Sequence, residues 1–389
     1  MVSNMEMLEV EIVKELRRLR GHINEREFFD IVCYLLCVME GMTEYLSIKG
    51  RGGMERSVSS LSRSLKKANR PLKDELKRQR ERLLKEMDKR NSVVIYADDI
   101  PDKKRGEKVA GAEPQYNGCE KKVTRSVSIV STMIKCGCLE FYSRSKKYVP
   151  LRRFKGNTRY FKKKTEIVRD LIAKDVEDIK KLGVKVRIIV CTDCGYANKE
   201  MVDFLRRLGA YHILAIKGNT VITLKSKDKA VNAYFLDKKF KKRSIDGKTV
   251  YFAESNLNLK SFGQQRVFCI KTSKNGDPRF FICDLRKAKP ETIIKIARQR
   301  WDDEQGHKDL KQYCGFRKRW TRKPSSQSIH YNLTYFLYNL LSEVRSRLKK
   351  LNEVLSIGAI AKRFVSFSES LIRPIVDFNA FYNLFDAFG

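Results

Sequence analysis

The arrangement of short apolar runs constrains the fold of this chain more than any other feature. Three runs with the pattern of strands, residues 92–97, 126–136 and 138–143, follow one another closely. Two further strand-like runs, residues 185–192 and 211–217, alternate with amphipathic segments whose apolar residues recur every three or four positions. Successive strands followed by alternating helices and strands predict an α/β fold, with a mixed sheet flanked by helices.

A second group of short runs interrupts this alternation between residues 219 and 286. Turn-forming pairs such as Asp246-Gly247 separate the runs from one another. We therefore predict a β-rich insertion within the α/β domain. Its expected strands are the runs VITLKS, AYFLD, TVYFAE, RVFCIKTS and RFFICD.

The remaining segments complete the expected domain organisation. Residues 1–48 are net acidic, whereas residues 49–90 are strongly basic. The basic part suits a DNA-binding helical module, but an ordinary pair of solvated helices explains the same charges, and both interpretations stay open. We predict a helical region at residues 1–90, an α/β core at 91–218 and 287–350, the insertion at 219–286, and a C-terminal helical tail at 351–389.

The charge balance of the chain is strongly basic. Lys and Arg number 82 against 46 Asp and Glu, which gives a net charge of +36. This balance favours a polyanionic partner, and nucleic acid is the leading choice because Lys and Arg displace counterions condensed on phosphates. Residues 141–170 interleave aromatic side chains with cations, which suits DNA, although a solvated loop with core aromatics gives the same pattern.

The sequence shows no membrane or secretory signal. Residues 1–18 lack the basic and then apolar pattern of a signal peptide, and no apolar run reaches the roughly 20 residues that span a bilayer. We therefore expect a cytoplasmic protein without a membrane partner. Among the ten cysteines, only Cys191 and Cys194 have CxxC spacing, and no histidine stands at ligand spacing to them, so a structural zinc site is not expected.

Three aspartates lie at the ends of strand-like runs. Asp98 and Asp99 close the first run, and Asp193 closes a later one. The ends of strands in α/β sheets are where functional side chains gather. Taken singly, however, such an aspartate is as readily a cap or a turn former.

The helix expected after the insertion carries a carboxylate among cations. Glu304 is separated from Arg300, Lys308 and Lys311 by helical spacings, so that all four share one face. This face can bind a metal ion together with adjacent DNA phosphates. An exposed ladder of salt bridges is the alternative interpretation.

The acidic segments resemble a known family. The segment RWDDEQGHKDLK is similar to the Y-R-E-K signature of insertion-sequence DDE transposases, because Arg300, Glu304 and Lys311 match its spacing of three and six intervening residues. The tyrosine position of the signature is occupied by Ala297, a departure that leaves the role of that tyrosine unfilled. The segments YADDIPDKKRG and IVCTDCGY are similar to the two aspartate blocks of the family, and the resemblance covers roughly residues 91–345.

The resemblance implies a fold and a catalytic site. The fold is a ribonuclease-H-like core with the insertion between the second aspartate and the glutamate. Asp99, Asp193 and Glu304 would bind two Mg²⁺ ions, for which Mn²⁺ can substitute, with Asp98 as the alternative to Asp99. Alignment of the family's Asp-Thr step with Asp99-Ile100 favours Asp99. Arg300, Lys308 and Lys311 would contact DNA phosphates.

The same resemblance implies an activity and partners. The expected activity is metal-dependent cleavage and strand transfer at the ends of an insertion sequence, as in cut-and-paste transposition. The partners are terminal inverted repeats and target DNA, contacted by a homodimer on the nucleoid of a prokaryotic cell. Two alternatives stay open: a nuclease of the same fold that does not join strands, and a decayed or repurposed DNA-binding protein without catalysis. Structural RNA binding would explain the charge but not the acidic segments.

Overall fold

The computed structural model describes residue 18 and residues 23–39, 58–88, 91–104, 109–117, 122–154, 158–224, 227–317 and 324–371. Within these ranges, the side chains of residues 26, 33, 36, 37, 58–62, 301–304 and 367–371 are not described. The helices are α2 (Glu25–Met39), α4 (Val58–Lys67), α5 (Asn69–Lys85), α6 (Lys164–Lys181), α7 (Lys199–Arg207), α8 (Val231–Leu236), α9 (Pro290–Gln312), α10 (Pro324–Lys350) and α11 (Ile357–Leu371), with short 3-10 turns η1 (Leu151–Phe154) and η2 (Thr158–Tyr160).

The strands form a single twelve-stranded sheet in the order β2-β3-β1-β5-β6-β12-β11-β10-β7-β8, with β4 paired to β3 and β9 paired to β10. They are β1 (Val93–Lys103), β2 (Glu113–Asn117), β3 (Lys122–Cys136), β4 (Leu139–Lys147), β5 (Ile188–Thr192), β6 (Tyr211–Ile216), β7 (Val221–Leu224), β8 (Lys227–Ala230), β9 (Lys241–Ile245), β10 (Lys248–Leu259), β11 (Gly263–Lys271) and β12 (Arg279–Cys283).

The sheet is mixed, as expected from the sequence. Strand β1 pairs antiparallel with β3 and parallel with β5, and β6 continues the parallel part. The strands β4, β3, β1, β5 and β6 form the ribonuclease-H-like core, in which parallel strands are connected through helices. Strands β7 to β12 extend the same sheet beyond β6, because β12 pairs with β6. The predicted α/β class with a β-rich insertion is confirmed.

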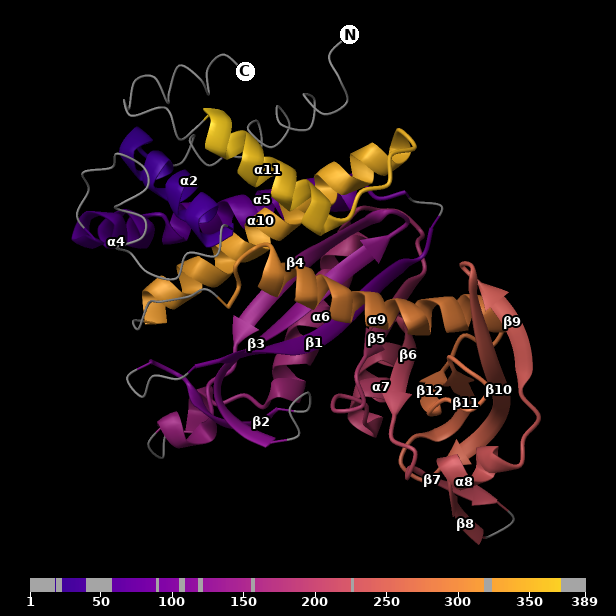
Figure 1. The fold of residues 1–389 in the computed structure, drawn as a ribbon. Helices are drawn as coiled ribbons and strands as arrows, with labels where there is room; N and C mark the ends of the chain where they lie inside the picture. Colours follow the sequence, from indigo (N-terminus) through magenta and orange to yellow (C-terminus); the bar gives the residue numbers. More distant parts are fainter. Residues whose placement is uncertain are drawn as a thin grey trace.

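The two faces of the sheet carry separate apolar cores. Side chains alternate along β1, so Val94 and Tyr96 belong to the core that contains α2, α4, α9, α10 and α11. Val93 and Ile95 belong to the opposite core, which contains α6, α7 and α8. In Figure 1, α9 lies across the sheet and reaches from the core strands to the insertion. The face on which a β1 side chain lies therefore decides which helices it can contact.

One predicted strand of the insertion is a helix. The run AYFLD lies mostly within α8, whose buried residues Val231 and Phe235 are four positions apart. That spacing places both side chains on one face of a helix, against the core with α6 and α7. The prediction of a strand was wrong, because an apolar run of this length fits either period and burial against the sheet decides between them.

The first strand also differs from its expected extent. Strand β1 continues to Lys103, so Asp98 and Asp99 lie within the strand and not at its end. The continuation is possible because β3 pairs with β1 as far as Lys103, whereas β5 pairs only as far as Ala97. Among the described residues, no helix has the length and apolar character needed to cross a membrane.

Helices near the amino terminus pack against α10. The buried side-chain amide of Asn339 in α10 donates to Gln79 Oε1 of α5 at 3.2 Å and to the carbonyl of Tyr142 in β4 at 3.0 Å. Its own oxygen accepts from the backbone N–H of Tyr142 at 2.7 Å. One amide thus joins α5, α10 and the edge strand β4. The helical character predicted for residues 1–90 holds for α2, α4 and α5, while a DNA-binding role of this region stays a prediction.

Candidate active site

The candidate site lies where the parallel pairing of β1 and β5 ends. Ala97 is paired with Thr192, the last residue of β5, and the next residues along the two strands are Asp98 and Asp193. Two aspartates therefore follow corresponding positions on neighbouring strands. Asp193 lies directly after β5, as the sequence predicted, and begins a turn in which the N–H of Tyr196 donates to its carbonyl at 3.0 Å.

Asp98 lies on the face of the sheet that α9 covers. It shares this face with Tyr96, two residues earlier in β1, whose hydroxyl donates to Gln299 of α9 at 3.4 Å. Burial, together with the neighbouring charges of Asp99 and Asp193, raises the pKa of Asp98 to about 7. The backbone N–H of Asp99 donates to Asp98 Oδ1 at 2.8 Å. Asp98 is thus a crowded carboxylate whose negative charge a cation would stabilise.

Asp99 points to the opposite face and is held by three donors. Lys164 Nζ of α6 and Ser128 Oγ of β3 each lie 2.6 Å from Asp99 Oδ2, and the Tyr196 hydroxyl donates to Oδ1 at 2.7 Å. Burial alone would raise the pKa of Asp99, but the Lys164 ammonium and the hydrogen bonds lower it below its ordinary value. These contacts join α6, β3 and the turn after Asp193. The structure therefore separates Asp99 from the face that carries α9.

Helix α9 brings Arg300 to Asp193. Arg300 Nη1 lies 3.7 Å from Asp193 Oδ1, and only 11% of the Arg300 side chain is exposed. Glu304 lies one turn further along α9, but its side chain lies outside the described residues. Lys308 is exposed and Lys311 is partly buried, further towards the end of the helix. The predicted helix is present, and its arginine is close to one of the predicted aspartates.

Two residues of α9 that were not singled out from the sequence, Gly306 and His307, pack closely against the strands and α10. A Cβ added at Gly306 would lie 3.1 Å from the Tyr338 hydroxyl of α10 and 3.5 Å from Met133 Sδ of β3. The next residue, His307, is buried and its ring stacks on Tyr142 at a centroid distance of 6.0 Å. Burial lowers the pKa of His307 to about 3, so this histidine is neutral at ordinary pH. A glycine inside a helix pattern was the available signal of such an approach.

A cavity opens at Cys194, directly after Asp193. It has a volume of about 570 Å³ and lies between the turn after β5, the start of α7 and the segment after β6. Its lining includes Lys199, Lys217, Asn219 and Phe262. Cations, an amide and an aromatic ring beside a carboxylate provide contacts for the phosphates and bases of a nucleic acid strand.

The segment at residues 141–170 divides into two parts. Phe141 and Tyr142 are buried in the two cores, as the loop-with-core-aromatics interpretation expected. Tyr160, in contrast, is 70% exposed and lies beneath the guanidinium of Arg159 at 5.8 Å from the ring centroid. Only the later part of this segment offers an exposed aromatic ring among cations.

The donor set suits a hard divalent cation. Asp98 and Asp193 offer carboxylate oxygens, which Mg²⁺ prefers, and their adjacent negative charges repel each other until a cation neutralises them. The nearby Cys194 is a poor ligand for Mg²⁺, and burial raises the pKa of its thiol. Among the described side chains, which do not include residues 301–304, no group of three or more His, Cys, Asp or Glu residues is placed to hold a metal ion.

Comparison with known proteins agrees with this geometry. Residues 164–340 match the family described as transposase DDE domain. No curated protein matches the chain. The matched residues include Asp193, Arg300 and Glu304, and they begin at Lys164, which contacts Asp99. The ribonuclease-H-like core and this match together support a DDE transposase.

Proposed function

We propose that this chain cuts DNA at the ends of a mobile element and joins the freed ends to target DNA. One observation carries the proposal: Asp98 and Asp193 follow the last paired residues of β1 and β5, and Arg300 of α9 contacts Asp193. Glu304 lies one turn beyond Arg300 and supplies the third carboxylate. Asp98, Asp193 and Glu304 would together hold two Mg²⁺ ions.

The geometry favours Asp98 over Asp99 as the first carboxylate. Asp98 shares the face of β1 with Tyr96, which contacts α9, whereas Asp99 is engaged by Lys164, Ser128 and Tyr196 on the other face. A carboxylate that accepts an ammonium and two hydroxyls has few lone pairs left for a metal. We infer that Asp99 is a positioning residue, which ties the turn after Asp193 to β1 and α6.

The chemistry follows from the roles of these groups. A bound metal pair would supply activation of the attacking oxygen and stabilisation of the leaving oxygen. Asp98, Asp193 and Glu304 would bind and orient the metal ions. Arg300 binds a non-bridging phosphate oxygen beside Asp193. Lys308 and Lys311 contact the phosphates that follow along the strand.

Each step conserves bonds to phosphorus. In the first step, a water oxygen forms a bond to phosphorus, the bond to the 3′ oxygen breaks, and that oxygen takes a proton. In the second step, the freed 3′ hydroxyl forms a bond to a target phosphorus and displaces another 3′ oxygen. The cavity beyond Asp193 accommodates the strand next to the scissile phosphate.

The test compares single amide substitutions on DNA that carries the flanks of the gene. We expect Asp98→Asn, Asp193→Asn and Glu304→Gln each to lower cleavage by more than about 10³-fold, because a lost carboxylate ligand weakens transition-state stabilisation by several kcal/mol. DNA affinity should change little. Asp99→Asn keeps one acceptor oxygen for Ser128 or Tyr196, and its NH2 group can donate to the other hydroxyl, so we expect a smaller loss, about 10-fold, with a shift in the Mg²⁺ concentration needed for half-maximal rate.

The outcomes separate the alternatives. Cleavage without joining by the native chain would identify a nuclease of the same fold, and binding without cleavage would identify a non-catalytic DNA-binding protein. Full activity of Glu304→Gln would sink the assignment of the third carboxylate. If Asp99→Asn lost all cleavage while Asp98→Asn remained active, Asp99 would be the ligand and Asp98 its neighbour.

A further inference from the structure

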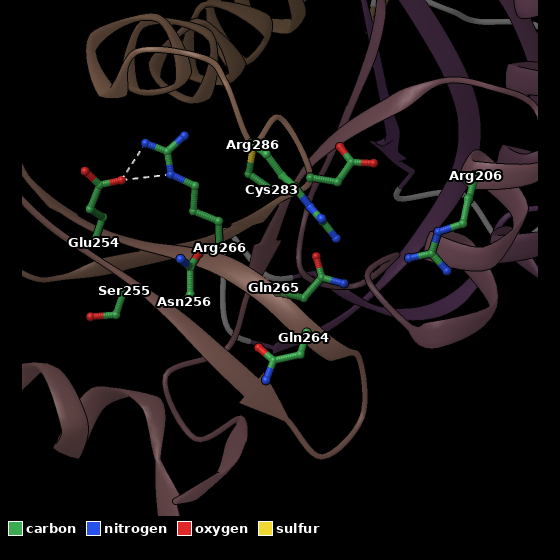
Figure 2. A pocket seen from close by; sticks show the side chains of 10 residues that line it. Arg206, Glu254, Ser255, Asn256, Gln264, Gln265, Arg266, Cys283 and Arg286 are labelled. Carbon is green, nitrogen blue, oxygen red and sulfur yellow. Dashed lines mark hydrogen bonds and ion pairs between the residues drawn. The ribbon is translucent and has the colours of Figure 1, made fainter.

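A cavity that the proposed chemistry does not use lies at the other end of the strands. Its volume is about 680 Å³, within the range of ligand-binding pockets. It lies near the amino-terminal end of β6, whereas Asp193 follows the carboxyl-terminal end of the parallel strand β5. Figure 2 shows its lining side chains: Arg206, Glu254, Ser255, Asn256, Gln264, Gln265, Arg266, Cys283, Asp284 and Arg286.

The cavity arises because β12 is shorter than its two neighbours. Cys283, the last residue of β12, pairs with Ile213 of β6 and with Arg266 of β11. Beyond it, β6 and β11 continue without a strand between them. The side chains of His212 and Gln265 bridge the gap with a contact of 3.1 Å between Nε2 and Oε1. The gap is thus a built feature of the sheet, closed at its base by a buried polar contact.

The acidic residues of the cavity have partners within the protein. Arg266 contacts Glu254 Oε2 through two nitrogens, at 2.8 and 2.6 Å. Asp284 accepts from the backbone N–H of His212 at 2.8 Å, and its other oxygen lies 3.1 Å from His212 Nδ1. Arg266 thus offsets the charge of Glu254, whereas Asp284 remains an ionised carboxylate that the cations of the cavity must outweigh to hold an anion.

Two arginines supply the excess positive charge. In Figure 2, Arg206 extends towards the cavity from α7, and Arg286 extends towards it from the segment after β12. Arg206 makes an ion pair with Asp203 through Nη1 at 3.3 Å, which leaves the rest of its guanidinium for another partner. Asn256 and Gln264 are exposed at the cavity and carry side-chain amides that both donate and accept.

We propose that this cavity binds one nucleotide unit of DNA, outside the strand that is cut. Arg206 and Arg286 hold the phosphodiester, and the amides of Asn256 and Gln264 contact the base edge, for which paired donor and acceptor groups are suited. This inference rests on the proposed function, because it takes the ligand to be the DNA on which the chain acts. The cavity would add a contact, distant from Asp98 and Asp193, that helps to position the duplex.

The test measures binding of duplexes from the gene flanks by fluorescence anisotropy across a range of salt concentrations. We expect Arg206→Ala/Arg286→Ala to weaken binding at least about tenfold near 0.15 M salt, and to make the salt dependence shallower by about two phosphate contacts. The control Lys248→Ala/Lys274→Ala removes the same charge at exposed insertion residues outside this cavity, and should leave affinity within about twofold. When the duplex is shortened stepwise, the native protein should lose the cavity contact at one defined length. Below that length, its DNA affinity should equal that of the arginine variant.

Several results would overturn the proposal. Unchanged DNA affinity of the arginine variant would exclude the contact, and an equal loss in the lysine control would indicate a general effect of charge. If calorimetry shows that native protein binds deoxyadenosine monophosphate or inorganic phosphate while the arginine variant retains full DNA affinity, the cavity serves a small anion instead. Arg286→Gln alone replaces the double variant if the latter does not fold. Because Asp193→Asn should abolish cleavage whatever the cavity binds, failure here leaves the proposed function intact.

Discussion

At the scale of single residues, neighbouring acids in β1 have opposite environments. Burial and two nearby carboxylates raise the pKa of Asp98. The pKa of Asp99 is lowered by an ammonium and hydrogen bonds, although burial alone would raise it. Alternation along a strand is the cause, since it places successive side chains on opposite faces. A histidine three residues after Glu304 shows the same dependence on surroundings, because burial keeps His307 neutral.

The buried His307 should make stability depend on pH. Its folded pKa of about 3 lies below the ordinary value of 6.5, so the unfolded chain binds a proton first as the pH falls. Stability is therefore complete above about pH 6.5 and falls below it, by about 2 kcal/mol at pH 5. We expect His307→Phe, which keeps a flat ring beside Tyr142, to remove this part of the acid loss. Urea unfolding of both proteins between pH 8 and pH 5 measures it, and parallel stability curves would contradict the assignment.

At the scale of elements, α9 is the part that completes the site. It carries Arg300 to Asp193, and it lies close to β3 and α10 because position 306 has no side chain. A glycine within a helix costs about 1 kcal/mol relative to alanine, so the close approach must compensate for that cost. The insertion also helps to position α9, because its last strand, β12, pairs with β6 and connects directly to α9.

Enlarging residue 306 should displace α9 from the sheet. We expect Gly306→Leu to lower the free energy of unfolding by roughly 1–3 kcal/mol through crowding against Tyr338 and Met133, and to lower cleavage more than DNA binding. Gly306→Ala gains helix propensity and needs only a small shift of the Tyr338 hydroxyl, so its stability should stay within about 1 kcal/mol of the native value. The control Gln312→Leu adds an apolar side chain at an exposed position of the same helix. Equal effects of Gly306→Leu and Gln312→Leu on cleavage would refute the packing argument.

At the scale of the whole molecule, the basic charge and the acids at β1 and β5 bear on how the proposed activity would engage DNA. The net charge of +36 provides long-range attraction to phosphates, while the acids at β1 and β5 need a cation to approach them. Each chain offers one such set of acids, whereas coordinated transposition acts on two element ends. We therefore expect two chains to act together on DNA.

The assembly on DNA should contain two chains and two element ends. Sedimentation velocity of the chain with duplexes from the gene flanks in Ca²⁺, which occupies oxygen sites and commonly does not support cleavage, measures the stoichiometry. Adding Asp193→Asn chains to native chains should reduce joined products more steeply than single-end cuts, because joining needs two active sites. A complex of one chain and one end that still joins both ends would exclude this arrangement.

The sequence by itself determined the parts that depend on local patterns. Apolar runs ending at Asp193 predicted a strand with an acid at its end, and the helical spacing of Arg300, Glu304 and Lys311 predicted α9. Period and turn residues act over a few positions, so they can be read without knowing the rest of the fold. The α/β class and the place of the insertion followed from the order of these elements.

Only the tertiary structure decided the parts that depend on distant contacts. The face of β1 covered by α9 separates Asp98 from Asp99, and no local pattern contains that information. The run within α8 is a helix because the helical period places Val231 and Phe235 on one face, where both are buried against the sheet. Tyr196 and Asp99 are 97 positions apart in sequence and meet only when the strands pair. Packing therefore decides their roles, whereas residue type decides only what chemistry they can perform.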